Sequence, residues 1–154
     1  MTQRVFSGML SVVGVTAALM LMIGSAAAQQ LTSTVDVPQG DLELGAVNIP
    51  RGVMADGQTL AAGDYVIRLT AEAATPDTVG ALTVLERWVE FRQGGDVRGR
   101  EVVSIVPNDE ISDVAKSAAP GSGSSRTELL RENEYMRVWI NQGGTHYLIH
   151  LVVG

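Results

Sequence analysis

The sequence contains no cysteine among its 154 residues. This absence excludes a lipid joined through a thioether, a disulfide-braced fold, a thiol enzyme and a Cys-ligated zinc site. Lysine is almost missing too, because Lys116 is the single representative. Schiff-base or P-loop chemistry would have to rest on that one residue, which lies in a short helix-like segment next to a Gly/Ser-rich stretch. Neither chemistry is therefore expected.

Positive charge is also scarce, with 11 basic residues against 17 acidic ones and a formal net charge of −6. Arg4 is the single charged residue among the first 28, so removal of that segment makes the chain more acidic still. An acidic chain repels a phosphate backbone. Nucleic acid is therefore not expected as a partner.

The first 28 residues have the three parts of a secretory signal. Arg4 supplies the positive start, “VVGVTAALMLMI” the apolar centre, and “SAAA” the small-residue exit before Gln29. Ala26 and Ala28 fit the A-x-A cleavage pattern. We expect a cleaved signal, a periplasmic or extracellular protein, and contact with the membrane only through the signal before cleavage. An uncleaved anchor over residues 6–28 is the alternative, since that segment is nearly long enough to span a bilayer.

Residues 29–154 have the length of a single domain. Apolar and polar residues alternate there in short segments separated by turn signals, a pattern typical of all-β proteins. Strands are expected in “LTSTVDV” (31–37), “LELGAVNI” (42–49), “YVIRLT” (65–70), “ALTVLERWVEFR” (81–92), “VRGREVVSIV” (97–106), “TELLR” (127–131), “EYMRVWIN” (134–141) and “THYLIHLVV” (145–153). We predict an antiparallel β-sandwich of about seven or eight strands with one short helix, and a small β-barrel as the alternative.

Turn residues mark the connections between these strands. The Gln-Gly-Gly runs at 93–95 and 142–144 predict two β-hairpins, because glycine tolerates positive φ at both turn positions. “PNDEISDVAKSA” (107–118) predicts a short helix with Asn108 as its cap and acids in its first turn. “APGSGSS” (119–125) predicts a flexible loop after that helix.

The segment “LAAGDYVIRLT” (60–70) combines a turn with a strand. Gly63 takes the third turn position, where φ must be positive, and Tyr65, Ile67 and Leu69 then share one face. The segment resembles the “(P/A)-A-G-x-Y-x-V-x-(L/V)” strand of exported bacterial β-sandwich modules of the prealbumin-like and carboxypeptidase-regulatory-like kind. With “GREVVSIVP” and “RVWINQGGTHYLIHL”, the chain is similar to uncharacterised small exported proteins of environmental bacteria. The resemblance implies a sandwich fold and an exported location, and it transfers no catalytic residue.

The sequence predicts no metal site and no cofactor. His146 and His150 in “HYLIH” share one face of the expected strand, but about 13 Å separates residues four apart, too far to bind one ion. Acids at 109, 110 and 113 could suggest calcium, yet the EF-hand spacing is missing and a helix N-terminus explains them.

No pattern predicts a catalytic residue, and we expect the protein not to be an enzyme. Ser122 and Ser124 lie in the expected loop, without the G-x-S-x-G elbow of a serine nucleophile. The acids of the 86–101 region alternate with arginines in the two arms of one predicted hairpin, so cross-strand ion pairs on a solvated face are the simpler interpretation than paired catalytic carboxylates. This set comprises Glu86, Glu90, Glu101, Arg87, Arg92, Arg98 and Arg100.

Aromatic residues are few, but both tryptophans fall on the more polar side of their strands. Trp88 alternates with charged residues, and Tyr135, Arg137 and Trp139 share a face of a second strand. These four residues are the ligand-binding candidates, because exposed Trp, Tyr and Arg anchor protein partners and flat aromatic faces stack on sugars. The competing interpretation is that a second sheet, the helix or the 119–125 loop covers the tryptophans.

These observations together predict a secreted or periplasmic, non-enzymatic binding or structural module of the cell envelope, with a protein or glycan partner. One alternative is a carbohydrate-binding module that uses Trp88, Trp139 and Tyr135. A further alternative is a metal-dependent or hydrolytic enzyme built from residues scattered in the sequence. Strands rich in Val and Ile at a chain end could also pair between copies, so the oligomeric state stays open.

Overall fold

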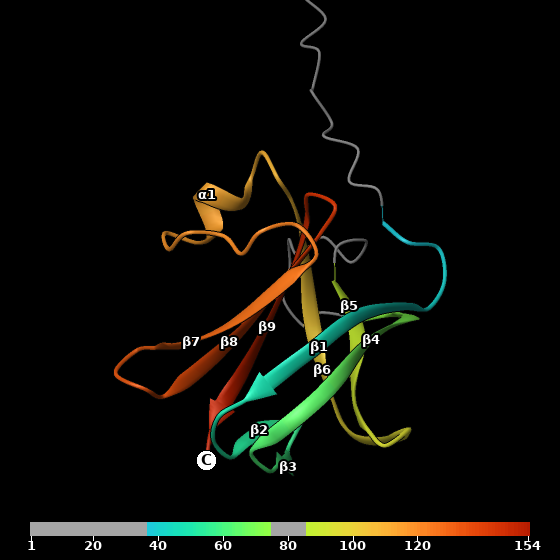
Figure 1. Cartoon of the computed structure of the whole chain (residues 1–154), viewed down its shortest axis with the longest axis vertical. Helices are drawn as coiled ribbons and strands as arrows, with labels where there is room; N and C mark the ends of the chain where they lie inside the picture. Colours follow the sequence, from blue (N-terminus) through green and yellow to red (C-terminus); the bar gives the residue numbers. More distant parts are fainter. Residues whose placement is uncertain (1–36, 75–85) are drawn as a thin grey trace, which may run out of the picture. The chain divides into compact units, whose positions relative to one another are not determined.

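The computed structural model of the chain describes residues 37–74 and 86–154 (Figure 1). The predicted signal lies outside these ranges, as do the predicted strand 31–37 except for Val37 and the first part of 81–92. The described elements are β1 (Leu42–Ile49), β2 (Val53–Ala55), β3 (Gln58–Leu60), β4 (Gly63–Ala73), β5 (Glu86–Gln93), β6 (Asp96–Pro107), α1 (Ile111–Val114), β7 (Ser124–Leu130), β8 (Tyr135–Gln142) and β9 (Thr145–Val153). The prediction of an all-β, antiparallel fold with one short helix is confirmed.

All of the described strands belong to one sheet, in which β7, β8, β9, β6, β5, β4 and β1 follow one another as antiparallel neighbours. The short β2–β3 hairpin joins the last residues of β9. The two edges of this path approach each other, because β1 lies beside β7 and β8. The Ser125 hydroxyl donates to the Ala46 carbonyl at 3.0 Å, and the Gln142 side chain donates to that of Leu44 at 2.9 Å. The sheet is thus a nearly closed barrel, the second of the two predicted architectures.

The barrel encloses the main hydrophobic core, to which every described strand except β7 contributes inward-facing residues. Met136, Val138 and Ile140 of β8 point into it, as does Ile149 of β9. Each such side chain stabilises the fold by about 1.5–3 kcal/mol relative to exposure. The residues between them lie on the opposite, outer face of the sheet. It is this outer face that carries the polar and aromatic side chains of interest.

The two Gln-Gly-Gly turns have the predicted geometry. Gly94 and Gly95 have φ values of 60° and 92°, and Gly143 and Gly144 have 60° and 91°. These angles match the hairpin turn that needs positive φ at both central residues, so both predicted hairpins are confirmed. Gly63 has positive φ as well, at 155°, but it is already the first residue of β4 and its angle is far from the roughly +80° of a third turn position, so the turn predicted there is wrong.

The segment after β6 differs from its prediction. The helix α1 has four residues, and the Asn108 side chain does not cap it, because its Oδ1 lies 3.1 Å from Nε2 of His146. The predicted cap is therefore wrong, because the Asn108 side chain bonds to the buried imidazole of His146 instead of to the helix N-terminus. The predicted loop 119–125 ends earlier than expected, since Ser124 and Ser125 already belong to β7.

The charged residues of β5 and β6 are also arranged differently from the prediction. Arg87 faces the core side with 9% of its surface exposed, whereas the sequence placed it on a solvated face. The ion pairs of Arg100 reach Asp56 at 3.6 Å and Glu72 at 3.5 Å, outside the β5–β6 hairpin. Glu90 pairs with an arginine of its own strand. Within the described residues, the expected ion pairs across this hairpin do not form.

Candidate functional site

The four predicted binding residues do not form one platform. Tyr135, Arg137 and Trp139 do share the outer face of β8, as the alternation predicts. Trp88 lies on β5, and β9 and β6 separate β5 from β8 in the sheet. Its half-buried ring packs under the guanidinium group of Arg100, with Cζ 3.9 Å from the ring centroid. The two tryptophans therefore cannot bind one ligand as a continuous surface.

Trp139 is covered, with 1% of its surface exposed. It packs in a second, smaller hydrophobic cluster with Val106, Leu148 and two residues of the α1 segment, Ile111 and Ala115. The interpretation of Trp139 as an exposed stacking residue is wrong. The competing interpretation, in which another part of the chain covers the tryptophan, is correct for Trp139, because the segment that carries α1 folds over this half of the outer face.

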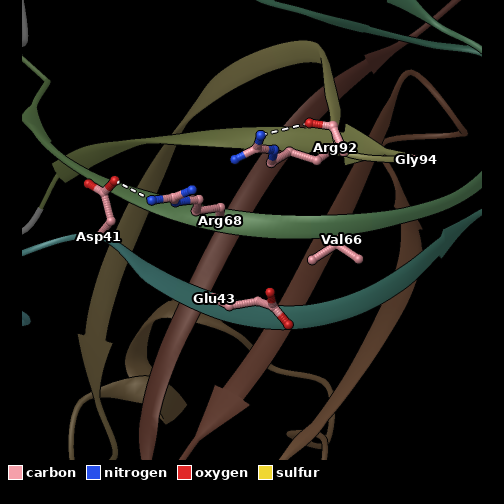
Figure 2. Close-up of a pocket in the computed structure, with 7 residues that line it drawn as sticks. Asp41, Glu43, Val66, Arg68, Arg92 and Gly94 are labelled. Carbon is pink, nitrogen blue, oxygen red and sulfur yellow. Dashed lines mark hydrogen bonds and ion pairs between the residues drawn. The ribbon is translucent and has the colours of Figure 1, made fainter.

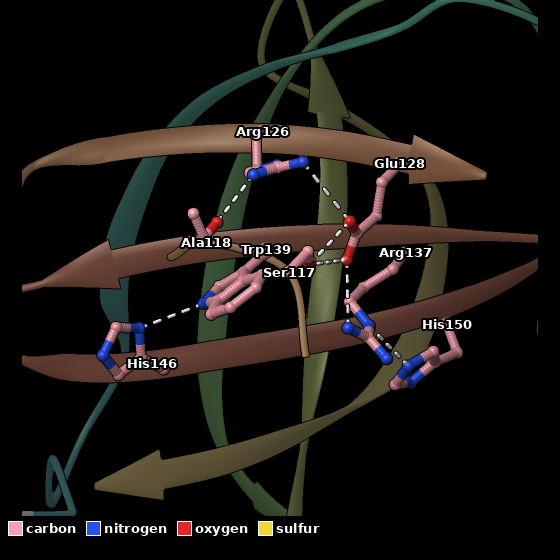
Figure 3. Close-up of polar contacts among 8 residues, drawn as sticks. All are labelled: Ser117, Ala118, Arg126, Glu128, Arg137, Trp139, His146 and His150. Carbon is pink, nitrogen blue, oxygen red and sulfur yellow. Dashed lines mark hydrogen bonds and ion pairs between the residues drawn. The ribbon is translucent and has the colours of Figure 1, made fainter. Parts of the chain in front are cut away.

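A hydrogen-bonded chain fixes Trp139 in this position. Its indole Nε1–H donates to Nδ1 of His146 at 3.0 Å (Figure 3). Nε2 of the same ring lies 3.1 Å from the Asn108 Oδ1. An acceptor at Nδ1 requires the neutral ring with its proton on Nε2, which then donates to Asn108. Burial lowers the pKa of His146, in agreement with a neutral imidazole. His146 thus serves as a structural connector between β8, β9 and the segment after β6.

The other half of the outer face is built around the carboxylate of Glu128 on β7 (Figure 3). Arg137 Nη1 donates to it at 3.0 Å, the Ser117 hydroxyl donates at 2.8 Å, and Arg126 Nη2 donates at 3.4 Å. The side chains of Glu128 and Arg137 are only 13% and 12% exposed. An ion pair this sheltered holds the Arg137 side chain in one orientation, and the carboxylate oxygens are already fully engaged.

Arg137 also connects to β9. The register places it opposite His150, and its Nε donates to the His150 Nε2 at 3.1 Å. The pKa of His150 is lowered by desolvation and by the positive charge of Arg137, while the charge of Glu128 acts in the opposite direction. The neutral ring that accepts this hydrogen bond carries its proton on Nδ1. Glu128, Arg137 and His150 thus form a row across three neighbouring strands.

A hollow of about 580 Å³ opens beside this row, and we call it the β8–β9 hollow. It is lined by Leu130, Arg131, Tyr135, Arg137 and His150. Two of the four predicted binding residues, Tyr135 and Arg137, are among them. The hollow is therefore the place where the structure brings part of the predicted site together.

The turn between β7 and β8 determines where Arg131 lies. Arg131, Glu132 and Asn133 have positive φ values of 49°, 55° and 76°, a left-handed run of non-glycine residues that costs conformational energy. Backbone bonds from Glu134 N to Arg131 O and from Val153 N to Glu134 O hold this turn against β9. The Arg131 guanidinium carbon lies 5.6 Å from the centroid of the Tyr135 ring. The turn thus places a guanidinium group at the rim of the hollow.

A second hollow, of about 470 Å³, lies over β1, β4 and β5 (Figure 2). Its lining mixes both signs of charge, since it contains Asp41 and Glu43 together with Arg68 and Arg92. Arg68 forms an ion pair with Asp41 at 2.8 Å, and both side chains are more than two-fifths exposed. We call it the Asp41 hollow. Exposed pairs of this kind contribute little energy and leave no fixed charge for a ligand.

The two histidines have separate roles, as their predicted spacing requires. They lie on the same face of β9, but His146 bonds to Trp139 and Asn108 while His150 bonds to Arg137. Within the described ranges, no group of three or more His, Cys, Asp or Glu residues could hold a metal ion. In the same ranges, no helix is long and apolar enough to cross a membrane.

Sequence reasoning missed three residues of the β8–β9 hollow and the carboxylate beside it. A partial signal was present: alternation places Glu128 and Leu130 on one face of β7, and the register of the β7–β8 hairpin then sets them opposite Arg137 and Tyr135. Arg131 follows at the start of the turn. Comparison with known proteins adds nothing to this site, because no protein-family model, curated protein or solved structure matches the chain.

Proposed function

We propose that this chain is an exported, non-enzymatic binding module of the cell envelope, and that the β8–β9 hollow is its binding site. One observation carries the proposal: the hollow of about 580 Å³ has an arginine, Arg137, that is fixed in place by a sheltered carboxylate. Its volume falls within the range of about 300–1,000 Å³ that is usual for ligand sites. A binding group that is already immobilised loses little entropy when a ligand arrives, which favours affinity.

The site chemistry supports binding rather than catalysis. The nearest pair that resembles a nucleophile and its base is Ser117 with Glu128, whose hydroxyl and carboxylate are 2.8 Å apart. Arg126 and Arg137 occupy the same carboxylate. This arrangement is an ion-pair network around one carboxylate rather than a nucleophile with a base dedicated to it. Support for export comes from the signal-like pattern of residues 1–28.

The experiment is a retention assay with the exported protein, purified after expression of the full chain and immobilised. Envelope extract and a panel of glycans are passed over wild type, Arg131→Gln and Trp88→Ala. We expect a component that wild type and Trp88→Ala retain and Arg131→Gln releases. Trp88 is the matched control because it lies on the same face of the sheet, outside the hollow.

Two results would contradict the proposal. A glycan released by Trp88→Ala but kept by Arg131→Gln would instead favour a carbohydrate-binding module on β5. If no component is retained by wild type and released by Arg131→Gln, the hollow is not a binding site and the proposed binding function is wrong.

A further inference from the structure

We infer that the β8–β9 hollow binds a small carboxylate with an apolar body, an inference that rests on the proposed function and names the class of its ligand. The lining combines two guanidinium groups, a histidine, a tyrosine and a leucine, and it contains no carboxylate. This composition matches an anionic head and a hydrophobic tail.

The polar groups of the lining are donors. Arg131 and Arg137 can only donate hydrogen bonds. The His150 ring accepts from Arg137 at Nε2, so its proton is on Nδ1 and can be given to a ligand oxygen. A carboxylate offers two oxygens and about four lone pairs, and it is recognised best by guanidinium donors.

The local charge also favours an anion, although the whole chain carries a formal net charge of −6. Glu128 neutralises one of its two arginine partners, Arg137, across a 3.0 Å ion pair. Arg131 forms no ion pair with any described residue, and its guanidinium group lies over the Tyr135 ring. Glu132 and Glu134 of the same turn are exposed and do not line the hollow. An excess of positive charge therefore faces the space that a ligand would fill.

The apolar part of the ligand has its own surface in the hollow. Leu130 and Tyr135 lie opposite each other at the ends of β7 and β8, and both are half-buried. Their side chains form one wall, with the Arg131 guanidinium above the tyrosine ring. An aliphatic chain packed there would remove apolar surface from water at about 25 cal/mol per Å². The Asp41 hollow lacks this combination, because acids and bases alternate in its lining.

The test is isothermal titration calorimetry of the exported protein with octanoate and with octanamide, which has the same tail and no charge. Wild type, Arg131→Gln and Arg68→Gln are compared. Arg68 is the matched control, since it is an exposed arginine that lines the Asp41 hollow. We expect octanoate to bind wild type and Arg68→Gln equally, to bind Arg131→Gln about tenfold more weakly, and to bind far better than octanamide.

Arg131→Lys provides a second check, because it keeps the charge but loses the planar fork; it should bind octanoate with an affinity between those of wild type and Arg131→Gln. Equal affinities of wild type for octanoate and octanamide would overturn the inference. So would an equal loss of octanoate affinity in Arg131→Gln and Arg68→Gln, or the absence of any octanoate binding to wild type. If octanoate fails while Arg131→Gln still releases an envelope component, the ligand class is wrong and the proposed function stands. If both experiments fail, the function itself is wrong.

Discussion

Replacement of Trp139 by phenylalanine should cost about 2–4 kcal/mol of the free energy of unfolding. The substitution removes the indole N–H that bonds to His146 at 3.0 Å, and it leaves the imidazole Nδ1 buried without a donor. An unsatisfied buried group costs about 1–3 kcal/mol. The smaller ring also leaves a cavity against Leu148 and Ile111, which adds about 1 kcal/mol.

The assay is urea unfolding followed by far-ultraviolet circular dichroism, at neutral pH where the His146 ring is uncharged. Trp88→Phe is the control, because it keeps an aromatic ring under Arg100 on an open part of the sheet. It should lose less than about 1 kcal/mol. Equal losses in the two variants, or a loss below about 1 kcal/mol in Trp139→Phe, would refute the argument that the hydrogen-bonded chain fixes Trp139 beneath the α1 segment.

Three further predictions concern other parts of the molecule. Acid should destabilise the fold: burial lowers the pKa of His146 from its ordinary value of 6.5, so the unfolded chain binds more protons just below pH 6.5. The stabilisation that the neutral His146 ring provides is complete above pH 6.5, and it is lost as the pH falls towards the lowered pKa of the folded state. Urea midpoints that rise as the pH falls through this range would contradict the prediction. Glu128→Gln should cost about 1–3 kcal/mol, because it leaves the sheltered charge of Arg137 without a counter-ion, and an unchanged urea midpoint would argue against that ion pair. Gly99→Ala should cost about 1–3 kcal/mol, since its Cβ would lie 2.9 Å from a methyl of Leu60, and combination with Leu60→Val should recover part of the loss in the same assay.

Local patterns predicted the longer strands and the two Gln-Gly-Gly hairpins because their determinants are local, but they missed the short strands β2 and β3. Two successive glycines with positive φ suffice to specify each Gln-Gly-Gly turn. Alternation then assigns each strand residue to a face, which is why Tyr135, Arg137 and Trp139 were correctly placed together. Alternation does not say what covers a face.

The burial of Trp139 depends on residues about 30 positions earlier in the chain. The α1 segment folds back over β8, and Asn108 bonds to His146 rather than to the helix. Its local sequence resembles an ordinary helix start, so no local pattern could predict this contact. Local patterns could not choose between the sandwich and the barrel either, because closure depends on how β1 and β7, far apart in sequence, approach each other.

Only part of the β8–β9 hollow could be predicted from the sequence. Tyr135 and Arg137 came from their strand, whereas the role of Glu128 required the hairpin register between β7 and β8. That register depends on the turn at Arg131, whose left-handed residues are not glycines and therefore do not specify the type of turn. Arg87 was misplaced because an arginine on a core-facing position contradicts the usual pattern.

The outer face of β8 and β9 has a covered half around Trp139 and an open half around His150. Paramagnetic relaxation by a soluble gadolinium chelate measures this difference, with the side-chain NMR signals of Trp139 and His150 recorded in the same sample. We expect strong relaxation of the His150 ring and almost none of the Trp139 indole N–H. Equal relaxation of the two signals would mean that the α1 segment does not cover Trp139, and it would return the binding site to the exposed aromatic face.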